Sequence, residues 1–190
     1  MGVHCVKLKS NTDWFEWLKA LMLALVFAFI VRIFFISPVI VEGPSMQPTL
    51  YNHDQMIVNK FIYKITEPNR FDIVIFHASE QKDYIKRVIG LPGEHVAIDD
   101  DKLYINDEEV AQPFLETNQT TLFPKLVNDF TLEELPGSHK TIPEDYVLVL
   151  GDNRSNSTDS RIIGLIHMDE IVGKASIIYW PIERLTLITD

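Results

Sequence analysis

A serine lies between two prolines in the stretch VEGPSMQPTL, and its hydroxyl is a candidate nucleophile. A serine hydroxyl attacks a carbonyl carbon only when an adjacent base removes its proton. Pro44 and Pro48 restrict the backbone on both sides of Ser45, which lowers the entropy cost of holding the hydroxyl in one geometry. A serine beside Gly-Pro is most often a turn residue, so the chemical interpretation depends on a base elsewhere in the chain.

The stretch DYIKRVIGLPGE supplies a lysine as a candidate base. Strand alternation puts Lys86 on the same face as Tyr84 and puts Arg87 on the opposite face. A lysine among apolar neighbours loses solvation of its charged form, which lowers its pKa from an ordinary value of about 10.4. A neutral Lys86 could then accept the proton of Ser45.

Histidine is the more common partner of a catalytic serine, and His53 and His77 remain alternatives because folding could bring either one near Ser45. Neither belongs to a motif with an aspartate to orient it. The six histidines show no His-x-x-x-His or comparable spacing, so the sequence predicts no metal site and no cofactor.

A second polar stretch, GDNRSNSTDSR, follows the apolar run YVLVL. Its asparagines, serines and charged residues are typical of a loop. The same composition fits a hydrogen-bonded scaffold that holds a serine and a lysine in register.

The elements that must position these residues begin with a long apolar segment. Residues 14–36 are apolar on nearly every helical face, and 23 residues at about 1.5 Å each span the hydrocarbon core. We expect a retained transmembrane helix rather than a cleaved signal peptide, because a cut after Ser37 would place Phe35 where a small residue is required. Lys7, Lys9 and Lys19 predict a cytoplasmic N-terminal segment (1–13) and an extracytoplasmic domain.

The charge of the chain is uneven. Residues 1–36 carry four basic and two acidic side chains, whereas the remainder carries 13 basic and 25 acidic ones. A nucleic-acid partner is not expected, because such proteins need a basic surface against the phosphates. The expected surroundings are a lipid bilayer and secreted proteins.

Short apolar runs separated by turn residues predict a mostly β domain after the membrane segment. Asn106-Asp107 predicts a hairpin turn. We expect an antiparallel-sheet catalytic domain (37–94 and 144–190) with a small inserted β subdomain (95–143). The expected strands lie within residues 56–65, 71–78, 84–91, 95–99, 102–105, 146–150 and 175–180.

Four motifs in order, GPSMQPTL, RFDIVIF, YIKRVIGLPGE and GDNRSNSTDSR, follow the apolar segment, and the chain resembles a bacterial type I signal peptidase of the short Gram-positive kind. The resemblance runs from the membrane segment to Trp180. It implies a membrane-bound serine endopeptidase in which Ser45 is the nucleophile, Lys86 the general base, and Ser157 a hydrogen-bond partner of the lysine amine. It also implies supporting charges at Asp152, Arg154, Asp159 and Arg161.

The resemblance further implies the substrate, a secretory preprotein cut through an acyl-enzyme after small residues in an Ala-x-Ala-like pattern. The substrate backbone would add as a strand beside residues 84–86 and 39–43. Two positions depart from the family pattern: Gly43 replaces a serine that helps bind the oxyanion in some members, and Phe71 replaces a small residue. The residues implied to line the substrate site are Gly43, Met46, Leu50, Tyr84 and Ile85.

Two other interpretations are weighed against this one. A self-cleaving repressor-type protease shares the Ser-Lys chemistry, but the chain lacks its DNA-binding N-terminus and its Ala-Gly cut site. A membrane-tethered β domain that binds secreted proteins without cutting them is the alternative from another functional class.

Overall fold

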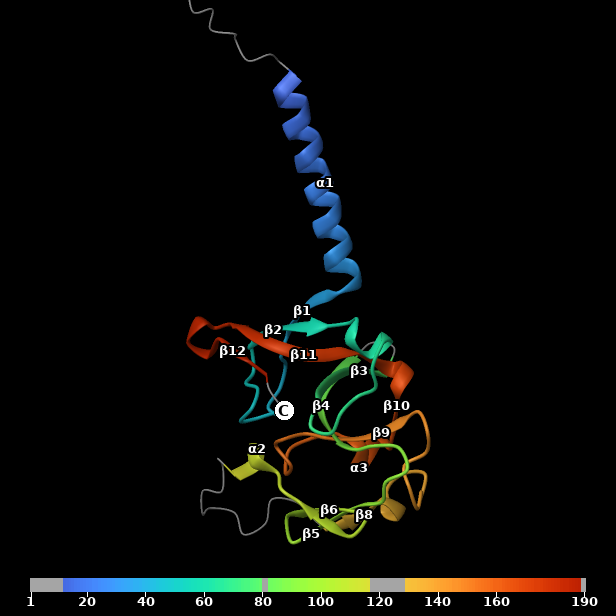
Figure 1. Cartoon of the computed structure of the whole chain (residues 1–190). Helices are drawn as coiled ribbons and strands as arrows, with labels where there is room; N and C mark the ends of the chain where they lie inside the picture. The colour runs from blue at the N-terminus through green and yellow to red at the C-terminus, as the bar shows by residue number, and fades with distance from the viewer. Residues whose placement is uncertain (1–11, 80–81, 117–128, 189–190) are drawn as a thin grey trace, which may run out of the picture.

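The computed structural model describes residues 12–79, 82–116 and 129–188. Helix α1 (Thr12–Phe34) stands clear of the β-rich remainder and joins it at β1 (Figure 1). Within α1, the stretch Trp14–Arg32 is long and apolar enough to cross a membrane, and none of it is buried against the protein. An apolar surface exposed on all sides is typical of a helix in lipid. The helix therefore fits the membrane anchor expected at residues 14–36; the N-terminal segment before it lies outside the described residues.

The main sheet has eight strands in the order β1-β2-β11-β3-β4-β9-β10, with β12 beside β11. Its pairings are antiparallel, so the predicted antiparallel β architecture is confirmed. The strands are β1 (Ile36–Ile40), β2 (Gln55–Asn59), β3 (Ile73–Ser79), β4 (Lys82–Gly90), β9 (Tyr146–Leu150), β10 (Ile166–His167), β11 (Ile171–Trp180) and β12 (Thr186–Leu187).

A second sheet lies at the end of the molecule away from α1 (Figure 1). It has the order β7-β6-β5-β8, and its residues fall within the predicted insertion 95–143. The predicted hairpin turn is confirmed: Asn106 and Asp107 have φ angles of 50° and 68°, the positive values that a tight two-residue hairpin turn requires. The strands are β5 (Val96–Asp99), β6 (Lys102–Ile105), β7 (Glu108–Val110) and β8 (Phe130–Thr131).

The strand predicted over residues 56–65 is correct up to Asn59, where β2 ends, and wrong beyond it. The Asn59 side-chain oxygen accepts hydrogen bonds from the backbone amides of Phe61 and Ile62, at 3.0 and 3.2 Å. An asparagine that bonds the backbone two and three residues ahead starts a turn in place of a ladder. The other short helices are η1 (Ile62–Lys64), α2 (Pro113–Glu116), η2 (Leu132–Glu134), α3 (Ser160–Ile163), η3 (Met168–Glu170) and η4 (Ile182–Arg184).

The small sheet and the main sheet share a hydrophobic core. Val96 and Leu103 of the small sheet pack in one buried cluster with Ile89 of β4 and with Leu148 and Leu150 of β9. Burial of this apolar surface is the main force holding the insertion against the sheet. The insertion thereby stabilises β4, which carries Lys86, and β9, which leads into the polar loop 151–159.

Two strand edges of the main sheet are open among the described residues. β1 pairs only with β2, and residues 82–86 of β4 pair only with β3, because β9 contacts β4 from Arg87 onward. Each open edge carries backbone N–H and C=O groups that can pair with another strand. These two edges flank the site described next.

Candidate active site

Ser45 lies in the loop between β1 and β2, which the core holds from beneath. Its neighbours Met46 and Leu50 are buried in a cluster with Val41, so the apolar residues of GPSMQPTL anchor the loop. The Ser45 carbonyl accepts a hydrogen bond from the Asn153 backbone amide at 3.0 Å. The packing of Met46 and Leu50 and the hydrogen bond from Asn153 together fix the backbone of the candidate nucleophile.

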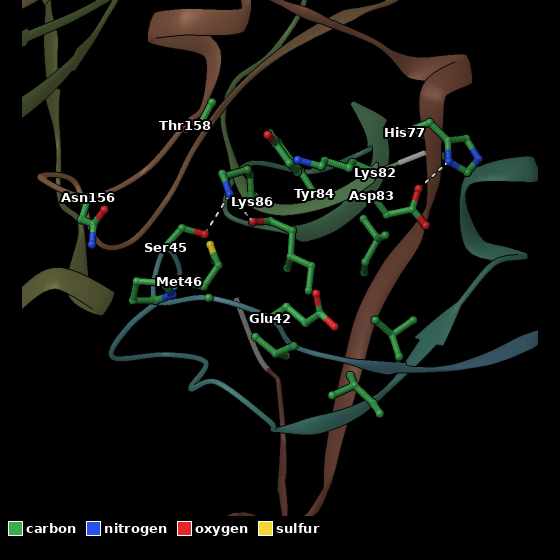
Figure 2. A pocket seen from close by; sticks show the side chains of 17 residues that line it. Glu42, Ser45, Met46, His77, Lys82, Asp83, Tyr84, Lys86, Asn156 and Thr158 are labelled. Atoms are coloured by element: carbon green, nitrogen blue, oxygen red, sulfur yellow. Dashed lines mark hydrogen bonds and ion pairs between the residues drawn. The ribbon is translucent and has the colours of Figure 1, made fainter. Parts of the chain in front are cut away.

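Lys86 reaches Ser45 from β4. The distance between Lys86 Nζ and Ser45 Oγ is 2.9 Å, and Nζ also donates to the Ile85 carbonyl at 2.9 Å (Figure 2). Lys86 is 4% exposed. The structure thus brings the two residues into direct hydrogen-bond contact although 41 positions separate them in the sequence.

Burial controls the charge of Lys86. Desolvation lowers the pKa of Lys86 from 10.5 to about 8, against the opposing attraction of Asp159 and Asp152, which raises it. A group with a pKa of about 8 is unprotonated in a substantial fraction of molecules at mildly alkaline pH. The amine can therefore act as a proton acceptor for the Ser45 hydroxyl.

Two ion pairs build the polar loop behind the lysine. Asp152 pairs with Arg87, with Oδ2 2.7 Å from Nη2, and both side chains are buried. Asp159 pairs with Arg161 at 2.7 Å and accepts the Gly151 amide at 3.0 Å. Burial raises the pKa of Asp159, but the hydrogen bonds from Arg161 and Gly151 outweigh it, and the net pKa lies below the ordinary value.

The structure places Ser157 beside the dyad, without the hydrogen bond expected to Lys86. Its buried hydroxyl oxygen meets no partner at ideal hydrogen-bond geometry among the described residues, but it lies close enough to the Asp159 carboxylate to help lower the pKa of that group. A Cβ added at Gly151 would collide with this oxygen, so Ser157 packs directly over Gly151. Because Leu150 pairs with Arg87 across the ladder, the same register brings Gly151 opposite Lys86.

Arg154 points away from the dyad, toward the insertion. Its Nη2 donates to the Gln112 side chain, and its guanidinium lies over the Phe114 ring, 6.0 Å from the centroid. Burial lowers its pKa to about 10. Arg154 therefore links the loop to the inserted subdomain and makes no direct contact with Ser45 or Lys86.

A groove of about 850 Å³ runs past the dyad between the two open strand edges. Gly43, Met46, Tyr84 and Ile85 line it, as expected, together with Ser45 and Lys86 (Figure 2). Leu50 is fully buried in the core beneath and does not reach the groove wall. The groove has an apolar floor and a polar rim.

The alternative bases lie elsewhere. His53 is exposed in the β1–β2 loop and does not line the groove, whereas His77 lines the groove and pairs with Asp83. Within residues 12–79, 82–116 and 129–188, no three His, Cys, Asp or Glu side chains gather to hold a metal ion. Lys86 is the titratable group in contact with Ser45.

Comparison of the sequence with known proteins identifies the family of the chain. The family described as signal peptidase, peptidase S26, matches residues 14–180. The chain belongs to this family. It is therefore a serine endopeptidase of the type I signal peptidase kind, which decides against the non-catalytic alternative.

Individual relatives of the signal peptidase family agree with this assignment. The signal peptidase I of Bacillus caldolyticus is 46% identical over 155 residues, 81% of this chain and 85% of that protein. The signal peptidase I P of Bacillus subtilis subsp. natto is 38% identical over 93% of this chain and 95% of its own. A crystal structure of a signal peptidase I from Enterococcus faecalis has a TM-score of 0.53 and 39% identity, covering 58% of this chain and 97% of that one.

Sequence reasoning missed several residues of this signal peptidase site. Arg87 was expected only to point away from Lys86, yet its pairing with Asp152 ties β4 to the polar loop. Asn153 holds the backbone of both Ser45 and Pro44, the latter through Nδ2 at 3.2 Å. Two adjacent basic residues in the apolar run YIKRVIGL were the available signal for Arg87. No feature of the sequence indicated Asn153.

Proposed function

We propose that the chain removes signal peptides from translocated preproteins by Ser-Lys catalysis, with Ser45 as nucleophile and Lys86 as general base. The observation that supports this most is the 2.9 Å contact between a buried amine and the only serine hydroxyl that it touches among the described residues. In the neutral form of Lys86, the amine accepts this hydrogen bond instead of donating it.

The reaction follows from this contact. The amine of Lys86 takes the hydroxyl proton while Oγ forms a bond to the scissile carbonyl carbon, giving a tetrahedral oxyanion. The Ser45 N–H has no hydrogen-bond partner among the described residues, and we assign to it the role of donor to that oxyanion. The oxyanion collapses, the C–N bond breaks, and the ammonium of Lys86 returns its proton to the leaving amine.

The same amine serves the second half of the reaction. With the mature protein gone, Lys86 is neutral again and takes a proton from a water molecule that attacks the acyl carbon. Collapse of this second tetrahedral species breaks the ester bond, and Ser45 regains its proton from Lys86. Ser157, Asp152, Arg154, Asp159 and Arg161 act as supporting groups that hold the dyad in place.

The substrate enters as a strand between the open edges of β1 and β4. It pairs with residues 39–43 on one side and 84–86 on the other, where β1 has only β2 as a neighbour and this part of β4 has only β3. Met46, Tyr84 and Ile85 line the groove beside Ser45 and Lys86, and we propose that they bound shallow pockets for small side chains such as that of alanine. We infer an Ala-x-Ala-like preference for the residues before the cut.

The placement of α1 sets the location of the reaction. The backbone amide of Lys60 donates to the carbonyl of Phe35, directly after α1, so the sheet is held next to the end of the helix. We propose a single-pass protein of the cell membrane with its N-terminus in the cytoplasm and the sheets outside. Ser45 then meets signal peptides close to the extracytoplasmic surface of the cell membrane.

Two variants test the dyad. We expect the full-length, detergent-solubilised Ser45→Ala and Lys86→Ala proteins to lose cleavage of a preprotein, because the members of a catalytic unit are each indispensable. His53→Asn is the matched control, since asparagine tolerates the φ of 71° at that position. Substantial cleavage by a folded Ser45→Ala protein would overturn the assignment of the nucleophile.

A further inference from the structure

The groove changes character along its length. Near the dyad its floor is apolar, formed by Val41, Ile75 and Ile85 of one hydrophobic cluster. Farther from Ser45 the groove meets a hydrogen-bonded pair: His77 Nδ1 lies 2.6 Å from Asp83 Oδ1 (Figure 2). The two side chains are 62% and 54% exposed, so this pair faces the open groove.

The ladder places the pair one step beyond the apolar floor. Ile75 pairs with Ile85 in the β3–β4 register, and His77 pairs with Asp83. Residues two apart in a strand lie on the same face, about 6.6 Å from each other. The His77–Asp83 pair is therefore the next rung of the face to which the apolar floor belongs.

A bound substrate strand has the same period. In the proposed pairing with residues 84–86, its residues before the cut run from Asp83 toward Lys86, because β4 is open at residues 82–86 and covered by β9 from Arg87 onward. Side chains at the first, third and fifth positions before the cut then point to one face. With the first and third over the apolar floor, the fifth meets the rung of His77 and Asp83.

We infer that His77 and Asp83 form a polar subsite for the fifth residue before the cut, where a hydrogen-bond donor such as lysine or glutamine is favoured over an apolar side chain. This inference rests on the proposed function. Because an apolar residue is disfavoured at that position, the subsite selects signal peptides whose hydrophobic segment ends at least five residues before the cut.

The chemistry of the rung supports this selection. Asp83 Oδ1 accepts from the His77 ring, and Oδ2 has no hydrogen-bond partner among the residues with a described position. A lysine or glutamine of the substrate can donate to Oδ2, whereas a leucine would displace water from the carboxylate and return no hydrogen bond. Glu42 and Lys82, which also line the groove, carry opposite charges, so the selection rests on the open Oδ2 and not on the net charge of the groove.

The test uses soluble peptides with alanine at the first and third positions before the cut and lysine, glutamine, leucine or glutamate at the fifth. For the full-length protein we expect kcat/KM to be about fivefold higher with lysine or glutamine than with leucine, at the low end of the 1–3 kcal/mol cost of an unmet hydrogen bond because the pair is half exposed. The difference should lie in KM. The same exchange at the fourth position, which faces away, should change kcat/KM little.

Variants locate the effect. Asp83→Leu and, independently, His77→Leu should abolish or reverse the preference against leucine. A matched control is Asp169→Leu, which alters an exposed His–Asp pair outside the groove and should keep the wild-type preference. Equal kcat/KM for lysine and leucine at the fifth position in the wild type, or an unchanged preference in folded Asp83→Leu, overturns the inference. Absence of cleavage of every peptide would instead count against the proposed function.

Discussion

The backbone carbonyl of Ser45 accepts a hydrogen bond from the backbone amide of Asn153, so two loops 108 positions apart in sequence hold each other at the site. The Asn153 side chain adds a second link, to the Pro44 carbonyl. Gly151, two residues before Asn153, continues the register of β9 to the position opposite Lys86. The spacing of nucleophile and base therefore depends on how closely the two loops approach.

Gly151→Ala tests this dependence. The added Cβ would collide with Ser157 Oγ and lie 2.5 Å from the Ser45 carbonyl oxygen, so one loop must move. Because a displacement of about 1 Å in a catalytic constellation costs about 100-fold in rate, we expect a loss of that order in kcat. Ser155→Ala, at an exposed position of the same loop, removes only a 3.3 Å hydrogen bond to Asn153 Oδ1 and adds no atom between the loops, so it should retain near wild-type kcat. Similar kcat for both variants would contradict the close-approach argument.

The pKa of Lys86 predicts the pH dependence. Since only the neutral amine accepts the serine proton, kcat/KM should rise about tenfold per pH unit and level off above an apparent pKa of about 8. A pH–rate profile on a soluble peptide measures this. An acidic limb of this profile with an apparent pKa near 10 would mean that Lys86 is a solvated lysine. An apparent pKa near 6.5 that disappeared when a single histidine was replaced would identify that histidine as the base.

The same pKa predicts a stability change. The folded protein binds the Lys86 proton less tightly (pKa about 8) than the unfolded chain (10.5), so burial destabilises the fold fully below pH 8 and not at all above pH 10.5. Lys86→Met should raise the free energy of unfolding at pH 7 by roughly 3 kcal/mol relative to its effect at pH 11. Urea titrations at the two pH values measure the difference. If Lys86→Met changed the free energy of unfolding equally at the two pH values, burial would not lower the pKa of Lys86.

Specificity at the cut provides a fourth test. Replacing alanine with phenylalanine at the position before the cut should nearly stop cleavage, because overfilling a small pocket costs several kcal/mol that a packed wall cannot relieve. Met46 is almost fully buried and has little room to move aside. The measurement is kcat/KM for the paired peptides. Efficient cleavage after phenylalanine would show that Met46, Tyr84 and Ile85 do not bound the first pocket.

The sequence predicts much of this architecture because its signals are local. The all-round apolar run marks α1, alternation marks the strands, and Asn106-Asp107 marks a hairpin. Features that depend on register could not be read. The sequence places His77 and Asp83 six residues apart, and only the β3–β4 pairing shows that they face each other across one rung.

Side-chain competition accounts for other differences. The alternation over 56–65 continues past Asn59, but the asparagine oxygen offers the next backbone amides a better local partner than a strand neighbour. Leu50 carries no signal that separates a pocket wall from the core beneath it. The hydrogen bond expected between Ser157 and Lys86 depends on side-chain geometry within the polar loop, which sequence patterns do not encode.

The open edges of β1 and β4 also bear on how the protein avoids aggregation in a crowded membrane. An unpaired edge can pair with the same edge of a neighbouring copy. Pro38 removes one backbone donor from β1, and Lys82 and Asp83 place opposite charges at the start of β4. A neighbouring copy would have to bury these charges to add its own strand, whereas a short peptide with a suitable polar residue need not. The features that admit substrate thereby limit self-association.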